Sequence, residues 1–205
     1  MPNAEPTSVP LSDDEVLAAA HLLERDWSRP LLTVTPRQER DSAAAVVRGV
    51  RSLALRGLLV DDELDGYVAQ VIAVATSAAP RAWVMTVDDK LQFRTDGMLV
   101  ELYEDGDRVL ARLTTVVGVN VFMPSSMDRV MDMVVGATWP PEGPESAPVA
   151  LLVRRDGDAD LGLLVDRNAV TSLLRDSDNA WTVGSEAVEA ADAEQLVAEL
   201  RRRLT

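Results

Sequence analysis

Apolar residues recur at helical spacing in the first part of the chain. The first helix is predicted to open at a capping box, Ser12-Asp13-Asp14-Glu15, and to run to about Asp26. A second helix is predicted to start at a Thr35-Pro36 cap and to end at Gly57, a left-handed terminator. The stripe of this second helix that we expect to be buried consists of Ala43, Val46, Val47, Val50, Leu53 and Ala54.

The apolar period then changes from that of a helix to that of a strand. A third helix is predicted from about 62 to 77, and alternation with a period of two begins at Trp83. Asp-Gly at 105–106 separates two alternating runs, which indicates a tight hairpin, and a further strand is predicted at 117–123. Because no helix-length crossover separates these runs, the strands are expected to be antiparallel.

The second half of the chain repeats a similar order of elements. Ser125 and Ser126 can cap a helix that ends near Gly136. Later segments are predicted as strands at 149–153 and 161–165, a short helix at about 169–175, a strand at 181–183 and a final helix capped by Asp192.

Together these elements predict an α+β fold, a largely antiparallel β-sheet flanked by N-terminal and C-terminal helices. Residues 1–11 are expected to be a disordered lead, and residues 12–205 a single domain. The Pro-rich segment 139–148 is expected to be a linker or extended loop, with two sub-halves on either side as one arrangement. The N-terminus lacks signal-peptide features and the longest apolar run is short, so we expect a cytoplasmic protein without membrane contact.

The composition excludes several kinds of catalytic site. The chain of 205 residues has no cysteine and one histidine, His21, which we expect at the surface or its boundary. Thiolate zinc sites and cysteine nucleophiles are therefore excluded. A calcium loop starting at Asp156 fails because Leu161 and Arg167 stand where Gly and Glu are needed. Phosphate-binding glycine loops are missing too, so we predict no catalytic residues, metal or cofactor, and no enzyme.

Two other functions stay open beside a binding role. The 34 acidic residues could supply a close carboxylate pair, as a carboxylate-dependent hydrolase requires. Arginines on the second helix, with Arg-Gly-Leu-Leu at 56–59, also occur in winged-helix regulators, where Arg48 and Arg51 would contact DNA. The formal net charge of −14 instead disfavours nucleic-acid binding.

A group of methionines is the candidate partner-binding segment. Met123, Met127 and Met131 recur every four residues, and Phe122 and Trp139 bracket them. Methionine side chains adapt to varied partners, but they also fill cores. This segment is therefore predicted either to bind a protein partner or to belong to the core.

Several N-terminal segments resemble the EspG family of type VII (ESX) secretion chaperones of actinobacteria. The likeness covers about residues 12–135 and includes "SLALRGLL", "DDELDGYVAQVIAVATSAAP" and the Trp-led strand "RAWVMTV". It implies a cytosolic chaperone that shields the apolar tip of a helical PE–PPE-type substrate. The chain is shorter than a typical member and the extended substrate-contacting loop is not located, so no binding residue is transferred. The function expected is a non-catalytic protein-binding module, a chaperone or adaptor, with a homodimer as a further expectation.

Overall fold

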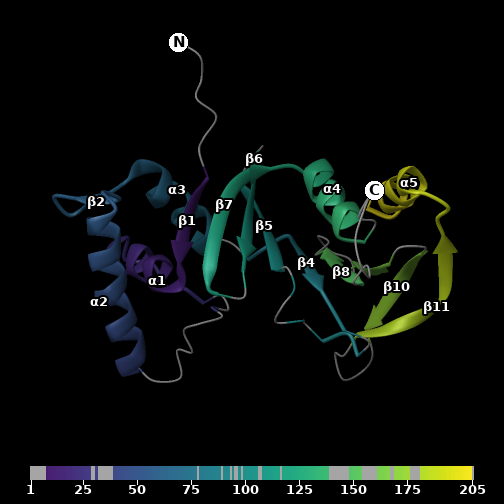
Figure 1. Cartoon of the computed structure of the whole chain (residues 1–205), viewed down its shortest axis with the longest axis horizontal. Coiled ribbons are helices and arrows are strands. Elements are labelled where there is room, and N and C mark those ends of the chain that lie inside the picture. The colour runs from purple at the N-terminus through teal and green to yellow at the C-terminus, as the bar shows by residue number, and fades with distance from the viewer. Residues whose placement is uncertain are drawn as a thin grey trace, which may run out of the picture. The chain divides into compact units, whose positions relative to one another are not determined.

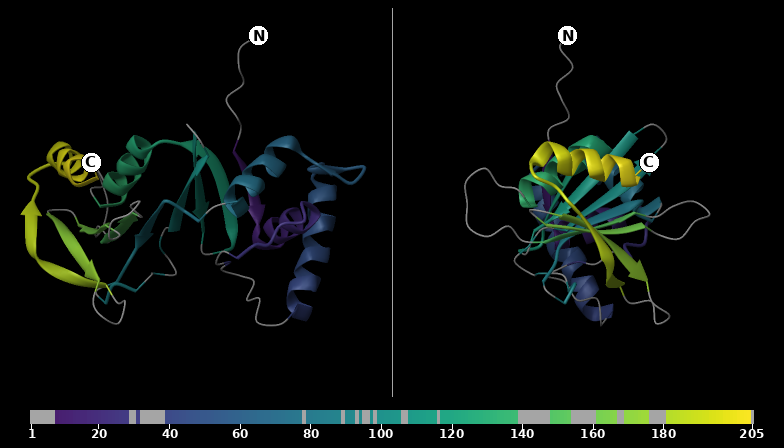
Figure 2. Two further views of the ribbon diagram at one scale, coloured as in Figure 1. Left: turned by 180° about the vertical axis from the view of Figure 1, so that it is seen from behind. Right: turned by 90° about the vertical axis from the view of Figure 1, so that its right-hand side faces the viewer.

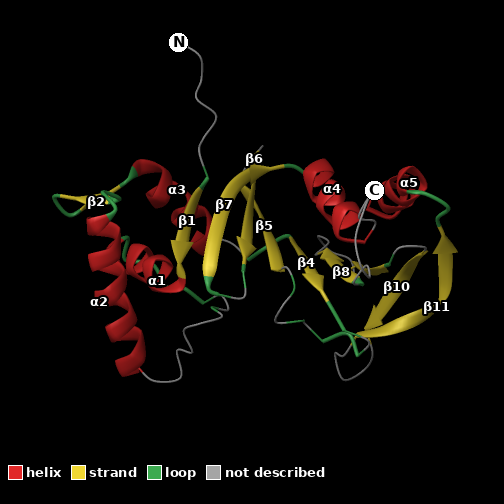
Figure 3. Ribbon diagram, viewed as in Figure 1, coloured by secondary structure: helices red, strands yellow, loops and turns green. Residues whose placement is uncertain are grey.

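The computed structural model describes most of the chain and shows an α+β fold (Figures 1 and 3). The described residues are 8–28, 31, 39–77, 79–88, 90–92, 94, 97, 99–105, 108–115, 117–138, 148–153, 161–166, 169–175 and 181–204. The helices are α1 (Asp13–Leu22), α2 (Glu39–Leu55), α3 (Gly66–Ser77), α4 (Met127–Thr138) and α5 (Ala193–Leu204). The strands are β1 (Val9–Ser12), β2 (Leu59–Val60), β3 (Glu63–Leu64), β4 (Ala82–Thr86), β5 (Leu99–Asp105), β6 (Arg108–Thr114), β7 (Val119–Ser125), β8 (Val149–Val153), β9 (Leu161–Val165), β10 (Ala169–Arg175) and β11 (Trp181–Glu189).

Nine of the strands form one sheet in the order β1-β7-β6-β5-β4-β8-β9-β10-β11, and β2 and β3 form a separate hairpin. The pairings β1–β7, β4–β8, β8–β9, β9–β10 and β10–β11 are antiparallel. The predicted fold class is therefore confirmed. By its contacts the chain divides into two compact units, unit 1 (Met1–Pro80 and Leu102–Pro124) and unit 2 (Arg81–Glu101 and Ser125–Thr205).

Unit 1 is built around α1, which packs against α2, α3 and β1. The capping box predicted at Ser12 is present: its hydroxyl accepts a hydrogen bond from the backbone N–H of Glu15, and the Glu15 carboxylate accepts one from the N–H of Ser12. The core of the unit comes from all three helices and from the strands. Its fully buried members include Leu11, Val16, Leu53, Ile72, Tyr103 and Phe122.

The contact between α1 and α2 is unusually close at Gly49. A Cβ atom on Gly49 would lie 2.0 Å from the carbonyl oxygen of Asp14 and 2.7 Å from the Cβ of Ala18. Only a residue without a side chain fits there. On the rim of the same contact, Arg48 donates two hydrogen bonds to the Asp14 carboxylate, at 2.6 and 3.0 Å.

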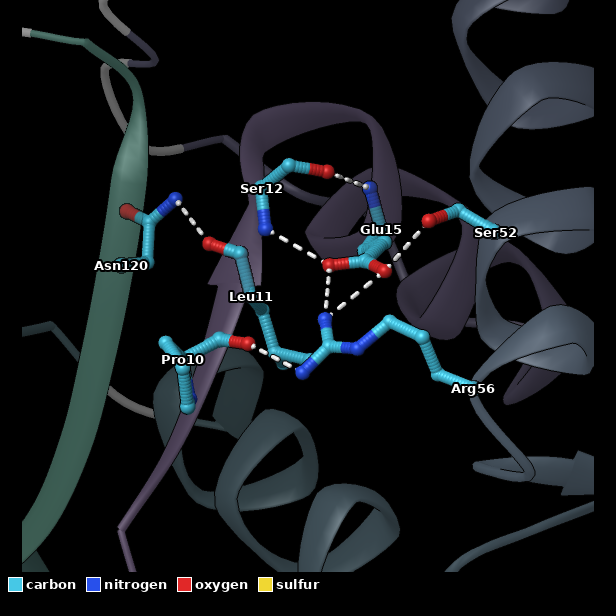
Figure 4. A network of polar contacts seen from close by, with 7 residues as sticks. All are labelled: Pro10, Leu11, Ser12, Glu15, Ser52, Arg56 and Asn120. Atoms are coloured by element: carbon cyan, nitrogen blue, oxygen red, sulfur yellow. Dashed lines mark hydrogen bonds and ion pairs between the residues drawn. The ribbon is translucent and has the colours of Figure 1, made fainter.

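A polar network joins β1, α1 and α2 through Glu15 (Figure 4). The Glu15 carboxylate accepts hydrogen bonds from the Ser52 hydroxyl (2.7 Å) and from Nη1 of Arg56 (2.7 and 2.9 Å), besides the N–H of Ser12. Arg56 also donates from Nη2 to the carbonyl of Pro10 at 2.9 Å. The short strand β1 is thus held by side-chain hydrogen bonds as well as by its pairing with β7.

A second network of polar side chains is fully buried and joins Asn120 of β7 to the start of α1. The Asn120 side-chain amide donates to the Asp13 carboxylate (2.8 Å) and to the carbonyl of Leu11 (3.3 Å), and its oxygen accepts from Nε of Arg112 at 2.9 Å. The Arg112 guanidinium lies 4.9 Å from the centre of the Trp27 ring, within cation–π distance. A buried charge is tolerated here because it is hydrogen-bonded and stacked.

Unit 2 consists of the strands β4 and β8 to β11, with α4 and α5 (Figure 1). One face of this sheet is buried over much of β4, β8 and β9 and at Val170 of β10. Its residues have exposed fractions of 0 to 9% and are Val84, Val149, Leu151, Val153, Leu163, Val165 and Val170. The two helices contact each other, α4 contacts β8 and α5 contacts β10. Arg203 of α5 donates to the hydroxyl of Ser172 at 2.7 Å, which places α5 on the same face as Leu163, the partner of Ser172 in the register.

Some elements differ from their prediction. The segment 169–175, expected as a short helix, is strand β10, because it is hydrogen-bonded between β9 and β11. The third helix begins at Gly66 rather than near Asp62. Residues 59–64 form the β2–β3 hairpin, whose turn holds Asp61 and Asp62 at positive φ. Strand β1 covers the end of the lead that was expected to lack order.

The predicted buried stripe of α2 is also wrong in part. Ala43, Val47 and Ala54 are exposed, whereas Ala45 and Leu53 are buried. The close approach at Gly49 decides the orientation, since it turns the smallest face of α2 toward α1. Strands β5 and β6, on either side of the expected hairpin turn, are neighbours in the sheet, and β8, β9 and a final helix capped by Asp192 are present as expected. Gly106 of that turn, the Thr35-Pro36 cap and residues 139–147 lie outside the described residues. His21 is exposed, as expected.

Candidate partner-binding surface

The second face of the sheet in unit 2 is the best candidate for a binding surface. In an antiparallel register, opposite residues project to the same side and neighbours along a strand to opposite sides. Trp83 is opposite Leu152, and Met85 is opposite Ala150, which in turn is opposite Leu164. These residues therefore project away from the face that carries α4 and α5.

The same face continues across β10 and β11. Leu152 is opposite Gly162, Gly162 is opposite Leu173, and Leu173 is opposite Val183. Trp181 projects to the same side as Val183, two residues away. We define the open sheet face as Trp83, Met85, Leu152, Leu164, Trp181 and Val183. In Figure 2 the helices α4 and α5 lie together on one side of the strands of unit 2.

The open sheet face is apolar where a solvent-facing sheet is normally polar. Antiparallel sheets with one buried face usually alternate apolar and polar side chains. Here Met85, Leu152, Leu164 and Trp181 pack around a small buried cluster of Val87, Ala150 and Leu173. Each of the four is only half-buried, and Val183 is 52% exposed. Leu91 packs against the same cluster. An apolar sheet face that keeps accessible surface is a candidate protein-interaction site.

Gly162 shapes the middle of this face. A Cβ atom on Gly162 would lie 2.7 Å from Cζ3 of Trp181 and 2.8 Å from the Cβ of Leu173. The indole of Trp181 therefore occupies the space over β9 that a side chain at Gly162 would take. The result is a broad aromatic and aliphatic surface rather than a row of separate side chains.

The residues singled out in the sequence lie in two different units. Phe122 is fully buried in the core of unit 1, and Met123 is half-buried on β7. Met127 is half-buried at the start of α4, whereas Met131 is 3% exposed. Trp139 lies outside the described residues. Of the four that are described, Met123 and Met127 retain accessible surface, and their role in binding stays a prediction.

The sequence did contain a signal for the open sheet face. The strands "VALLV" at 149–153 and "LGLLV" at 161–165 are apolar at nearly every position. A strand with one solvent-facing side should alternate, so continuous apolar runs indicate that both faces avoid water. The sequence of a single strand does not tell which of its two faces is covered by the chain's own helices. Only the strand register shows which residues share the other face.

The Glu15 network has the polar composition of a catalytic site but a different environment. Burial raises the pKa of Glu15, but hydrogen bonds from Ser52, the N–H of Ser12 and Arg56 lower it more, so the net pKa lies below its usual value. Both carboxylate oxygens are occupied by donors within the chain. The network is suited to joining β1, α1 and α2, and less suited to taking a proton from a substrate.

Comparison with solved structures defines the class of fold. No protein-family model and no curated protein sequence matches the chain. The fold is similar to that of EspG5, a type VII secretion system chaperone of Mycobacterium tuberculosis, in a structure of that chaperone in complex with a PE25–PPE41 dimer. The TM-score is 0.55 at 15% sequence identity, over 97% of this chain and 96% of EspG5. The chain thus has an EspG-like fold. None of the helices in the described part of the chain is long and apolar enough to cross a membrane.

Proposed function

We propose that this protein is a non-catalytic cytoplasmic chaperone or adaptor that binds a helical substrate of a type VII secretion system through the open sheet face. The observation that carries the proposal is the apolar character of that face, with half-buried Trp83, Met85 and Trp181 and exposed Val183. Shielding an apolar helical tip requires a surface that is itself apolar and broad.

The EspG-like fold supports the same function. EspG5 was solved bound to a PE25–PPE41 dimer, and that dimer suggests the chemical class of partner to test first. A helix laid on an apolar surface is a common mode of recognition, in which a few aromatic and aliphatic anchors supply most of the affinity. Trp83 and Trp181 are anchors of this kind.

The test is binding of PE–PPE-type heterodimers from the native host, measured by co-elution and isothermal titration. We expect a stable complex that Val183→Asp weakens by roughly tenfold or more, since a buried carboxylate would then face apolar partner atoms. Val183 is chosen because it is 52% exposed, so the substitution should not disturb folding.

The matched control is Val117→Asp, which changes the same kind of residue at a position in unit 1 that is 70% exposed. This variant should bind like the unmodified chain. Thermal unfolding of both variants checks that they fold. The proposal would be rejected if no PE–PPE-type dimer binds, or if a complex forms and Val183→Asp leaves its affinity unchanged.

A further inference from the structure

A second apolar surface lies on unit 1, on the side of α2 that faces away from α1. We define the outer stripe of α2 as Ala44, Val47, Arg51, Ala54 and Leu55. All five are exposed, with Val47 at 51% and Leu55 at 89%. Among the residues of α2 whose burial is described, those fully buried on the inward side are Ala45, Gly49 and Leu53. A helix that is apolar on its outer side as well as its inner side is usually covered on both.

The spacing of the outer stripe matches the seam of a packed helix pair. From Ala44 the positions advance by three, four and three residues, through Val47 and Arg51 to Ala54. This alternation keeps side chains on one line of a helix and lets a second helix pack along it. The stretch from Ala44 to Leu55 is about 16 Å long, or three turns. At its C-terminal end α2 contacts β2, where Val60 is 59% exposed.

Arg51 identifies the charge of the partner. The neighbouring arginines of this helix end are engaged, Arg48 with Asp14 and Arg56 with Glu15. Arg51 has no hydrogen bond or ion pair with any described residue. Asp41, an exposed acid on the same helix, is ten residues away and so about 80° around the helix axis from Arg51. Arg51 is therefore available to pair with a carboxylate on a helix packed along the stripe, without competition from a described acid of this chain.

A second copy of the chain fits this stripe poorly. Two α2 helices packed antiparallel on their outer stripes would place Arg51 against Val47 of the other copy. The two Arg51 side chains would then be about one turn apart with no acid in the seam. Each copy also carries a net charge of −14, which opposes self-association.

We propose that the outer stripe of α2 binds an amphipathic helix of another protein, with small apolar residues along its seam and a carboxylate opposite Arg51. This inference does not depend on the proposed function, because the stripe belongs to unit 1 and the open sheet face to unit 2.

Two synthetic helical peptides test the proposal with the whole chain, by fluorescence anisotropy. Each is about 20 residues long, or 30 Å of helix, with Leu and Ala along one seam. One carries Glu at the central seam position and the other carries Lys there. We expect the Glu peptide to bind more tightly, by up to roughly fivefold, as for a partly exposed ion pair. Arg51→Glu should reverse this preference, and Val47→Asp should remove the binding of both peptides.

Val117→Asp is again the control and should leave both affinities unchanged. The proposal is overturned if neither peptide binds, if both bind equally, or if binding survives Val47→Asp in a folded variant. Light scattering tests whether a second copy of the chain occupies the stripe instead. A concentration-dependent dimer that Val47→Asp abolishes would assign the stripe to a second copy and would also overturn the proposal. Loss of PE–PPE binding in Val183→Asp with normal peptide binding separates this surface from the open sheet face.

Discussion

Glu15 joins three segments of unit 1 with one carboxylate. It lies in the first turn of α1, where an acidic side chain also interacts favourably with the helix dipole. Its oxygens accept from Ser12, Ser52 and Arg56, so β1, α1 and the C-terminal end of α2 are held together. With an exposed fraction of 2%, the carboxylate has exchanged water for donors supplied by the chain.

The stability of the protein should therefore depend on the ionisation of Glu15. Its pKa in the folded chain is lowered from 4.5, so its stabilising effect is complete above about pH 4.5 and is lost as the pH falls through the folded pKa. We expect Glu15→Gln to lower the free energy of unfolding by about 1–3 kcal/mol at neutral pH. The difference from the unmodified chain should shrink below pH 4.5.

Urea unfolding at a series of pH values measures this difference. Glu186→Gln is the control, because Glu186 is exposed on β11 and its loss should change little at any pH. If the difference in the free energy of unfolding between Glu15→Gln and the unmodified chain stays constant down to the lowest pH at which the chain folds, the ionised carboxylate is not its cause.

At the scale of elements, the packing of α1 on α2 depends on one glycine. We expect Gly49→Ala to destabilise the protein by about 1–3 kcal/mol, since the new Cβ would meet the Asp14 carbonyl at 2.0 Å. In an open helix the same change should stabilise by about 0.4–1 kcal/mol. A Cβ atom on Gly136 of α4 would meet no neighbouring atom within 4 Å, so Gly136→Ala is the matched comparison. In thermal unfolding we expect a lower midpoint for Gly49→Ala and a higher midpoint for Gly136→Ala. The same change of midpoint in both variants would exclude a steric cause.

The sequence predicted elements well where local signals decide them. The caps at Ser12 and Asp192 gave correct helix starts because cap residues act through their own backbone neighbours. Strand β10 was predicted as a helix because "AVTSLLR" has no decisive local preference and its state is set by pairing with β9 and β11. The inward side of α2 was misassigned because several apolar residues lie on both sides and the contact at Gly49 chooses between them.

The candidate surfaces were harder to predict than the fold. A sheet face becomes a surface only once the register has placed Trp83 beside Leu152 and Trp181 across Gly162, residues up to 98 positions apart in the sequence. Methionine spacing in one helix could not supply that information, and Met131 belongs to the core of unit 2. Long-range pairing thus decides which apolar residues are left accessible.

For the whole molecule, the charge distribution restricts the kind of partner. The chain has 34 acidic and 20 basic residues. Several arginines that could have formed a basic patch are paired within the chain, including Arg48 with Asp14, Arg56 with Glu15 and Arg202 with Glu199. The hydrogen bonds from Arg202 and Arg203 lower the pKa of Glu199 to about 2, so this cluster stays ionised over the physiological range. Such pairing leaves a predominantly negative surface with apolar areas, which favours protein partners over phosphate backbones.

A winged-helix regulator would require Arg48 and Arg51 to neutralise phosphates, and this gives the last prediction. We expect no retention on duplex DNA at about 50 mM salt, where a protein with several phosphate contacts binds strongly. Because Arg48 is held by Asp14 at 2.6 Å, Arg48→Gln should lower the midpoint of thermal unfolding and leave DNA retention unchanged. Arg51→Gln should change neither, since Arg51 has no pair to lose among the described residues. Retention that falls steeply between about 50 and 200 mM salt and weakens in both variants would instead support DNA binding through α2.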